Sequence, residues 1–238
     1  MAPNKNIDRS YDQCSYRLCG ESRETMGARL RACSRCKVMH YCSKECQKND
    51  WPNHQKACKE MAHERDIVNA QFNGECVYQY FCRWIQRHWP TLIDALLAIL
   101  DISTNPTAHE KRALQVMVSY KGGNAGSTDV ASCMEVQMVS PFDLERAIRN
   151  EPARYEPLLA YRKRLGEDVK RVRPSTYDAG IIFIALVTPE GECITVRGLP
   201  VTFETSEALK PVPKGWQHAI MAKLSCGIVG LDVDVLAA

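Results

Sequence analysis

The 238-residue sequence has no long hydrophobic run, and its first residues contain no apolar stretch of the kind found in secretory signals. The longest apolar stretches, at residues 95–100 and 179–187, are too short to span a bilayer. We therefore expect an intracellular protein, in the cytoplasm, the nucleus or both, with no membrane partner.

A large charge excess, internal repeats and low-complexity tracts are also missing. The 31 Lys and Arg residues nearly balance the 28 Asp and Glu residues, and 45% of the chain is apolar. This composition argues against a wholly disordered chain, which would have fewer apolar residues or a stronger net charge. The length suits one ordinary domain together with a small accessory module.

Cysteine is abundant, and it is concentrated at one end of the chain. Seven of the twelve cysteines lie within the first 58 residues. In a reducing compartment such a cluster more often binds metal than forms disulfides. With one histidine these cysteines form four spaced pairs: Cys14 and Cys19, Cys33 and Cys36, Cys42 and Cys46, His54 and Cys58.

Four such pairs match the needs of zinc, which binds four thiolate or imidazole ligands at the corners of a tetrahedron. Each short pair closes a small chelate ring at little entropic cost. Eight ligands fill two sites and leave no position open for a catalytic water, so we expect two structural zinc ions. The spacing alone leaves open whether neighbouring pairs or alternating pairs share an ion.

The second and third ligand pairs also predict local structure. The two residues between Cys33 and Cys36 suit a tight turn. Ser43 suits the N-cap of a short helix that contains Cys46, because its hydroxyl can accept a bond from an amide of the first turn. His40 lies beside the turn but is not needed to complete a site, and we expect it to be exposed.

The last ligand pair predicts a second short helix. Residues 50–52, Asp-Trp-Pro, supply a start signal, because proline is tolerated in the first turn of a helix. His54 and Cys58 are four residues apart and would lie on one face of this helix. We therefore expect two small helices to carry three of the ligands and turns to carry the others.

Residues 14–58 resemble the MYND-type zinc finger. The resemblance rests on Cys-x4-Cys, on Cys-Ser-Arg-Cys, on Tyr-Cys-Ser-Lys-Glu-Cys-Gln from residue 41, and on Trp-Pro-Asn-His-Gln-Lys-Ala-Cys from residue 51. A segment this short has too little core to fold unaided, so zinc binding would supply the missing stability. The resemblance implies interleaved ligation, in which one ion takes Cys14, Cys19, Cys42 and Cys46 and the other takes Cys33, Cys36, His54 and Cys58.

The resemblance also implies a function for this segment. Fingers of this type act mainly as protein-interaction modules and bind short proline-containing peptides in a shallow groove. Gln47 and Trp51 match the positions that line that groove. The chemistry is consistent, since an indole face packs on a proline ring and an amide can bond an extended backbone. We therefore expect an adaptor or scaffold protein whose partners carry proline-containing linear motifs.

Nucleic acid is not an expected partner. Residues 1–60 carry 12 Lys and Arg against 7 Asp and Glu, which suggests a basic N-terminal segment. Seven thiolates and two zinc ions would reduce this formal charge of +5 to about +2. A basic stripe of the kind that follows phosphates is therefore not evident. A role in transcription or chromatin regulation, with or near nucleic acid, is the first alternative.

An enzyme is the second alternative, with an unrecognised catalytic domain in the C-terminal part. Some MYND fingers occur in lysine methyltransferases of the SET family, which use an Asn-His-containing cofactor motif. The only Asn-His pair here is Asn53–His54, and its histidine is assigned to zinc. The remaining histidines lie near no Ser or Cys signature of nucleophilic catalysis. We therefore expect no enzymatic activity, and no catalytic or cofactor-binding residue is predicted beyond the zinc ligands.

The composition changes after the finger and indicates four regions. We expect an N-terminal tail over residues 1–13, the finger over 14–58, a helical segment over 59–109 and an α+β domain over 110–238. Alternating or apolar β-branched residues predict strands near 114–120 and 181–187 and a hairpin from 181 to 197. Together they predict a mainly antiparallel sheet of about four strands.

Three further patterns in this part have ordinary structural interpretations. Ser140 and Pro141 predict the start of a helix that ends near residue 150. The glycine-rich residues 121–126 lack a complete phosphate-binding motif and predict a flexible hairpin loop. Five scattered cysteines lack paired spacing, and we expect them in the core: Cys76, Cys82, Cys133, Cys193 and Cys226.

Overall fold

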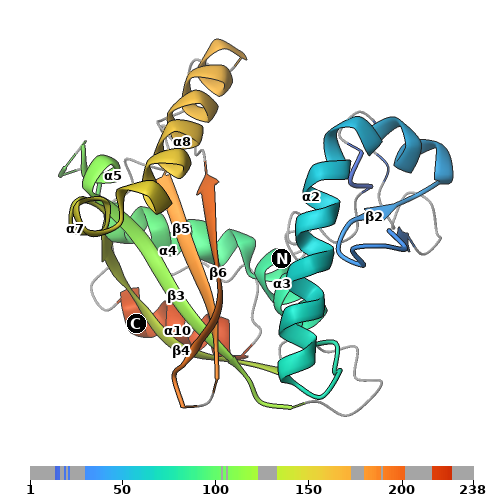
Figure 1. Cartoon of the computed structure of the whole chain (residues 1–238). Helices are drawn as coiled ribbons and strands as arrows, with labels where there is room; N and C mark the ends of the chain where they lie inside the picture. Colours follow the sequence, from blue (N-terminus) through green and yellow to red (C-terminus); the bar gives the residue numbers. More distant parts are fainter. Residues whose placement is uncertain are drawn as a thin grey trace, which may run out of the picture. The chain divides into compact units, whose positions relative to one another are not determined.

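The computed structural model describes residues 14–16, 19, 21, 30–102, 104–105, 107–122, 133–172, 180–188, 190–201 and 216–226, and its elements are labelled in Figure 1. The expected tail, residues 1–13, lies outside the described residues. The chain divides into two compact units. The first comprises Met1–Trp89 with Gly122–Met134, and the second comprises Pro90–Lys121 with Glu135–Ala238.

In the described residues of the first unit, a small hairpin is followed by two helices. Strands β1 (Arg31–Ala32) and β2 (His40–Tyr41) pair antiparallel. Helix α2 (Lys44–Gln71) follows, and then helix α3 (Val77–Arg87). The turn between the helices uses two positive φ angles, at Asn73 and Gly74, and the helix therefore stops close to the Asn-Gly pair.

Helix α2 is one element, so the expectation of two separate short helices in this region was wrong. Pro52, which we interpreted as part of a helix start, lies inside α2. A proline inside a helix removes one backbone hydrogen bond and bends the helix without having to end it. The ribbon of α2 changes direction in its first half (Figure 1).

The second unit is built on a four-stranded sheet with the order β4-β3-β5-β6. Its strands are β3 (Arg112–Tyr120), β4 (Met134–Asp143), β5 (Gly180–Val187) and β6 (Cys193–Val201). The β5–β6 hairpin is antiparallel, as predicted, but β3 and β5 are parallel. The sheet is therefore mixed, and the expectation of a mainly antiparallel sheet was wrong at its central pair.

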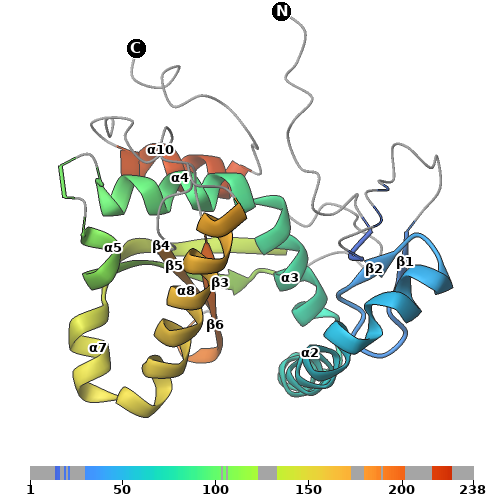
Figure 2. The ribbon, with the colours of Figure 1, turned by 90° about the horizontal axis from the view of Figure 1, so that it is seen from above.

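Helices cover both faces of this sheet (Figure 2). Helices α4 (Trp89–Leu100) and α10 (Trp216–Cys226) lie on one face, and α7 (Leu144–Asn150) and α8 (Pro152–Val172) lie on the other. Every residue of β5 is consequently buried. A strand buried on both faces reads as one continuous apolar run, which explains the sequence of β5.

Two helices of the second unit adjoin strands directly. Helix α5 (Ala108–Lys111) leads directly into β3. Helix α7 begins at Leu144 with Asp143 as its N-cap, whose Oδ1 accepts a 2.9 Å hydrogen bond from the amide of Arg146. The expected start at Ser140 and Pro141 was wrong, because both residues belong to β4. The aspartate three residues before Arg146 supplies the cap instead.

Among the helices of the described part of the chain, none has both the length and the apolar character needed to cross a bilayer.

Candidate metal centre

The β1–β2 hairpin places the first buried ligand pair. The chain turns directly after β1, and the amide of Cys33 donates a 2.8 Å bond to the carbonyl of Met39. The amide of Lys37 donates back to the carbonyl of Cys33 at 3.0 Å, with Lys37 at a φ of 61°. This tight turn directs the thiols of Cys33 and Cys36 inward, where both are buried.

The start of α2 places the next ligands. The Oγ of Ser43 accepts a 3.1 Å bond from the amide of Cys46, which confirms Ser43 as the N-cap. Cys42 therefore precedes the helix and Cys46 lies within its first turn. Further along the same helix, His54 and Cys58 are one turn apart and buried.

A local backbone hydrogen bond and two bonds to His40 of β2 hold the N-terminal ligand segment. The amide of Cys14 donates a 2.8 Å bond to the carbonyl of Glu21, which closes the loop that contains Cys19. The amide of Ser15 donates to the carbonyl of His40, and the amide of His40 donates to the Oγ of Ser15 at 3.0 Å. His40 is half-buried at this junction and not exposed as expected.

The structure gathers the eight ligand-type residues into two interleaved groups. Within each group the ligand atoms all lie within 4.8 Å of one another. This is the grouping that the family resemblance implies and that the spacing left open. The first tetrad is Cys14, Cys19, Cys42 and Cys46, and the second tetrad is Cys33, Cys36, His54 and Cys58.

The distances within the tetrads fit zinc. A Zn–S bond of about 2.3 Å places two sulfurs of a tetrahedron about 3.8 Å apart. In the first tetrad the Sγ–Sγ distances are 3.5 Å for Cys19 and Cys42 and 3.4 Å for Cys42 and Cys46. In the second tetrad the Sγ atoms of Cys33 and Cys58 are 3.8 Å apart. A disulfide would need about 2.0 Å. The two tetrads are therefore compatible with two structural zinc ions.

Electrostatics are compatible with the same assignment, although the shifts differ in sign within each tetrad: the pKa of Cys33 is lowered to about 6 and that of Cys46 is also lowered. Burial, followed by the neighbouring Cys33 thiol, raises the pKa of Cys58 to about 12. Burial also raises the pKa of Cys42 to about 12, with Cys46 and Cys19 adding to the effect. Thiolates this close repel one another, so a doubly charged cation is what allows them to hold their charge together. With all four positions taken by the protein, such a site is closed and structural.

The two tetrads differ in their access to water. In the second tetrad all four ligands are buried, with exposed fractions of 0–3%. In the first tetrad Cys14 is buried, whereas Cys19, Cys42 and Cys46 are only partly covered. The first tetrad is therefore the more accessible of the two.

A buried hydrogen bond supports the second tetrad and was not found from the sequence. The phenol of Tyr41 donates to the Oδ2 of Asp50 at 2.8 Å, and the Tyr41 ring meets the His54 ring edge-on with centroids 6.1 Å apart. Burial, then the bond to Asp50, raises the pKa of Tyr41 far above its usual range. The sequence pattern indicates Asp50 only as part of a helix start. No local sequence signal indicates that a residue nine positions earlier would bind it.

The structure places Gln47 and Trp51 one turn apart on α2. Gln47 is half-exposed, and 38% of Trp51 is exposed. The indole of Trp51 meets the ring of His54 edge-on, with ring centroids 6.0 Å apart. An exposed aromatic side chain therefore rests on one of the ligands of the second tetrad.

Of the five scattered cysteines, the structure buries Cys82 and Cys133 but exposes Cys76 and Cys193. The core expectation was wrong for these two, because Cys76 only caps α3 and Cys193 begins the edge strand β6. The side chain of Cys226 lies outside the described residues. Most of the glycine-rich loop, residues 123–126, also lies outside them.

Comparison with known proteins identifies the segment that carries the tetrads. Residues 14–58 match the family model of the MYND finger. Over 66 residues the chain is 38% identical to the histone-lysine N-methyltransferase SMYD3 of Homo sapiens, covering 25% of this chain and 15% of that protein. It is also 40% identical over 45 residues to SET domain-containing protein 14 of Caenorhabditis elegans, covering 19% of this chain and 10% of that protein.

A third relative also matches over a short segment. The SET domain and MYND-type zinc finger protein 6 of Schizosaccharomyces pombe is 52% identical over 33 residues, which are 14% of this chain and 7% of that protein. The chain thus spans no more than 15% of the length of these three relatives. No solved structure matches the chain significantly.

Proposed function

We propose that residues 14–58 form a zinc-stabilised docking surface for short, proline-containing segments of partner proteins. The MYND finger is a protein-interaction module. The observation that supports binding of proline-containing segments is the exposed indole of Trp51. Trp51 is 38% exposed on the helix that carries ligands of both tetrads. Core packing does not account for such an exposed aromatic side chain, whereas ligand binding does. Its face suits a proline ring.

The contact between Trp51 and His54 supports a preformed surface. The two rings meet edge-on at 6.0 Å, and His54 is fixed by the second tetrad. A recognition side chain that is already held in place loses little entropy when a ligand binds. Zinc would thus stabilise the finger and also orient the side chain that contacts the peptide.

The position of Gln47 suits binding of a peptide in an extended conformation. It lies one helical turn before Trp51 and is half-exposed, so both side chains are open to the same ligand. Its amide can donate to and accept from one backbone, as an extended peptide requires. Within the described residues the Gln47 side chain makes no hydrogen bond that would compete with this role.

We propose binding, and not group transfer, as the role of the segment that matches the methyltransferase relatives. The matched residues lie in and around the finger, where each tetrad takes four protein ligands and leaves no position for a substrate. The single Asn-His pair of the chain, Asn53–His54, contributes its histidine to the second tetrad.

Fluorescence anisotropy with an array of proline-containing decapeptides tests this proposal on the full, zinc-loaded chain. Trp51→Ala should abolish binding, and Trp51→Phe should retain part of it, because the smaller ring still offers an aromatic face. Ile67→Ala is the matched control, since Ile67 is 46% exposed on the same helix and should leave binding unchanged. Native mass spectrometry should count two zinc ions in every variant. Unchanged binding in a Trp51→Ala protein that still holds two ions would overturn the proposal.

A further inference from the structure

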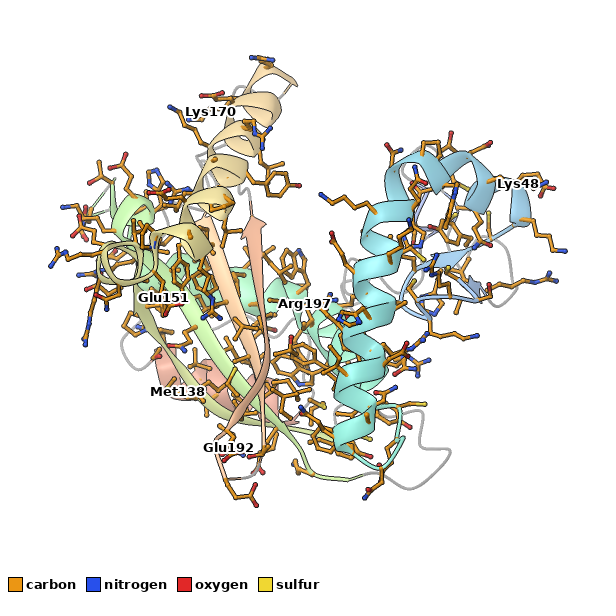
Figure 3. All side chains as sticks on the ribbon, in the orientation of Figure 1. Lys48, Met138, Glu151, Lys170, Glu192 and Arg197 are labelled. Carbon is orange, nitrogen blue, oxygen red and sulfur yellow. The ribbon has the colours of Figure 1, made fainter. Side chains whose placement is uncertain are left out.

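Two lysines flank the proposed peptide site on α2. Successive residues of a helix are about 100° apart, which places Lys44, Gln47, Lys48 and Trp51 within one face of about 100°. Both lysines are exposed, and Lys48 lies at the N-terminal end of the helix (Figure 3). The helix face that carries Trp51 is therefore positively charged toward the N-terminus of α2.

The helix offers these lysines little neutralising charge. Within the described residues neither Lys44 nor Lys48 forms a salt bridge. Asp50 is buried and accepts from Tyr41, so it does not face them. Glu45, the exposed residue that follows Lys44, has a pKa lowered chiefly by its own backbone amide and by Ser43, with smaller effects from Lys48 and Lys44.

We infer that the peptide bound at Gln47 and Trp51 is acidic on one side of its proline, with carboxylates that pair with Lys44 and Lys48. This inference rests on the proposed peptide-binding function and adds the charge of the partner. Charge complementarity favours such a partner, because the two lysines would repel basic flanks and would form no ion pair with neutral flanks.

The spacing of the lysines fits an extended peptide. Along the helix axis Lys48 lies about 4.5 Å and Lys44 about 10.5 Å from Trp51. A proline-rich peptide advances about 3.1 Å per residue. Acidic side chains one to four positions away from the docked proline would therefore reach the two ammonium groups.

A peptide fits this face better than a nucleic acid does. Nucleic acids are bound by extended basic stripes or patches, and two lysines beside one indole are a small charge. An exposed tryptophan beside a half-exposed amide is instead the chemistry of proline recognition. The test below includes an oligonucleotide, so that binding of nucleic acid through these lysines would be detected.

The test compares three probes on the full, zinc-loaded chain by fluorescence anisotropy. The first is a decapeptide with a central Pro-Pro preceded by three glutamates, the second replaces those glutamates with glutamine, and the third is a ten-nucleotide oligothymidine. The acidic peptide should bind about fivefold more tightly than its glutamine counterpart, as expected for two exposed ion pairs. This difference should shrink in high salt, because salt screens exposed charges.

Variants assign the effect to the two lysines. The double substitution Lys44→Gln, Lys48→Gln should bring the acidic peptide to the affinity of the glutamine peptide. Lys56→Gln is the matched control, because Lys56 is exposed on the same helix but outside this face. Glu45→Gln should tighten binding of the acidic peptide, since it removes the competing carboxylate.

The outcomes separate this inference from the proposed function. Equal affinity for the two peptides, with both lost in Trp51→Ala, would overturn the acidic specificity and leave the docking proposal intact. Absence of binding by both peptides would overturn both proposals. A loss of oligothymidine binding in the double variant, with no discrimination between the peptides, would reassign the lysines to nucleic acid and would also overturn the inference.

Discussion

Tyr41 and Asp50 form a buried hydrogen bond that joins strand β2 to helix α2 behind the second tetrad. The Oη–Oδ2 distance is 2.8 Å, and the exposed fractions of the two residues are 1% and 7%. The bond connects the element that leads to Cys42 with the helix that carries His54. It therefore supports the finger from the protein side, independently of the metal.

Tyr41→Phe should destabilise the finger by about 1–3 kcal/mol, because the substitution leaves the buried Asp50 carboxylate without its donor. Urea unfolding of the zinc-loaded chain measures this loss. Tyr161→Phe is the matched control, since Tyr161 is 49% exposed, and it should change stability by less than about 0.5 kcal/mol. Equal stability of the Tyr41 variant and wild type would show that the bond contributes nothing.

A chelator should remove the two zinc ions one after the other. The ion bound by Cys14, Cys19, Cys42 and Cys46 should leave first, because this tetrad is partly exposed whereas the other is buried. Attack by a chelator needs access to the coordination sphere, which burial restricts. Native mass spectrometry during treatment with EDTA should show a species with one ion accumulating before the metal-free protein.

Substitutions identify which ion leaves first. Cys42→Ser should remove the fast phase of zinc release and leave one slowly released ion. Cys58→Ser should remove the slow phase and leave one rapidly released ion. Release of both ions with a single rate in wild type, or a slow remaining ion in the Cys58→Ser protein, would contradict the order.

The ligand residues could be chosen from the sequence because chelating pairs are local, and each pair spans only a few residues. The grouping of the pairs depends on contacts between distant segments, such as the bond from the amide of His40 to Ser15, 25 residues earlier. Spacing carries no information about such contacts. The role of Asp50 was missed for the same reason, since its partner Tyr41 lies on another element.

The sheet shows a similar limit. The apolar run of β5 and its hairpin with β6 were predictable, because strand composition and turn residues are local features. The direction of β3 relative to β5 was not predicted, since β4, α7 and α8 intervene in the sequence. The continuous apolar run of β5 was nevertheless a signal, because strands that are buried on both faces occur mostly in parallel arrangements.

Gly198 leaves room for the close approach of the Leu158 side chain of α8 to β6. A Cβ atom added at Gly198 would lie 2.7 Å from the Cδ2 of Leu158 and 3.2 Å from the Cε1 of Phe183. Gly198→Ala should therefore destabilise the second unit by about 1–2 kcal/mol, because the Leu158 side chain and the Phe183 ring must move. Chemical unfolding followed by circular dichroism measures the change.

A double-mutant cycle separates the steric clash from other effects of alanine. In a Leu158→Ala background the nearer obstacle is gone, so Gly198→Ala should cost about 1 kcal/mol less than it does in wild type. The same loss in both backgrounds would show that the contact with Leu158 is not the cause.

His88 should make the stability of the chain depend on mild acid. Its ring is fully buried, lies 4.8 Å from the ring of Trp84, and forms no hydrogen bond through either nitrogen to the described residues. Burial, with a smaller effect from Arg87, lowers the pKa of His88 to about 4 from its usual 6.5. The folded chain therefore resists a proton that the unfolded chain accepts.

The sign of the effect follows from this difference. Above pH 6.5 the histidine is neutral in both states and has no linked cost. Between pH 6.5 and about 4 only the unfolded state binds the proton, so stability falls as the pH falls. This linkage predicts a loss of about 2 kcal/mol between pH 7 and pH 5.

The variant His88→Phe retains a ring beside Trp84 and removes the titrating group, so it isolates this contribution. Its unfolding free energy should fall by about 2 kcal/mol less than that of wild type between pH 7 and pH 5. Loss of zinc in acid affects both proteins alike, because His88 is not a member of either tetrad. Parallel pH profiles for the two proteins would show that His88 is protonated in the folded chain and that burial does not exclude the proton.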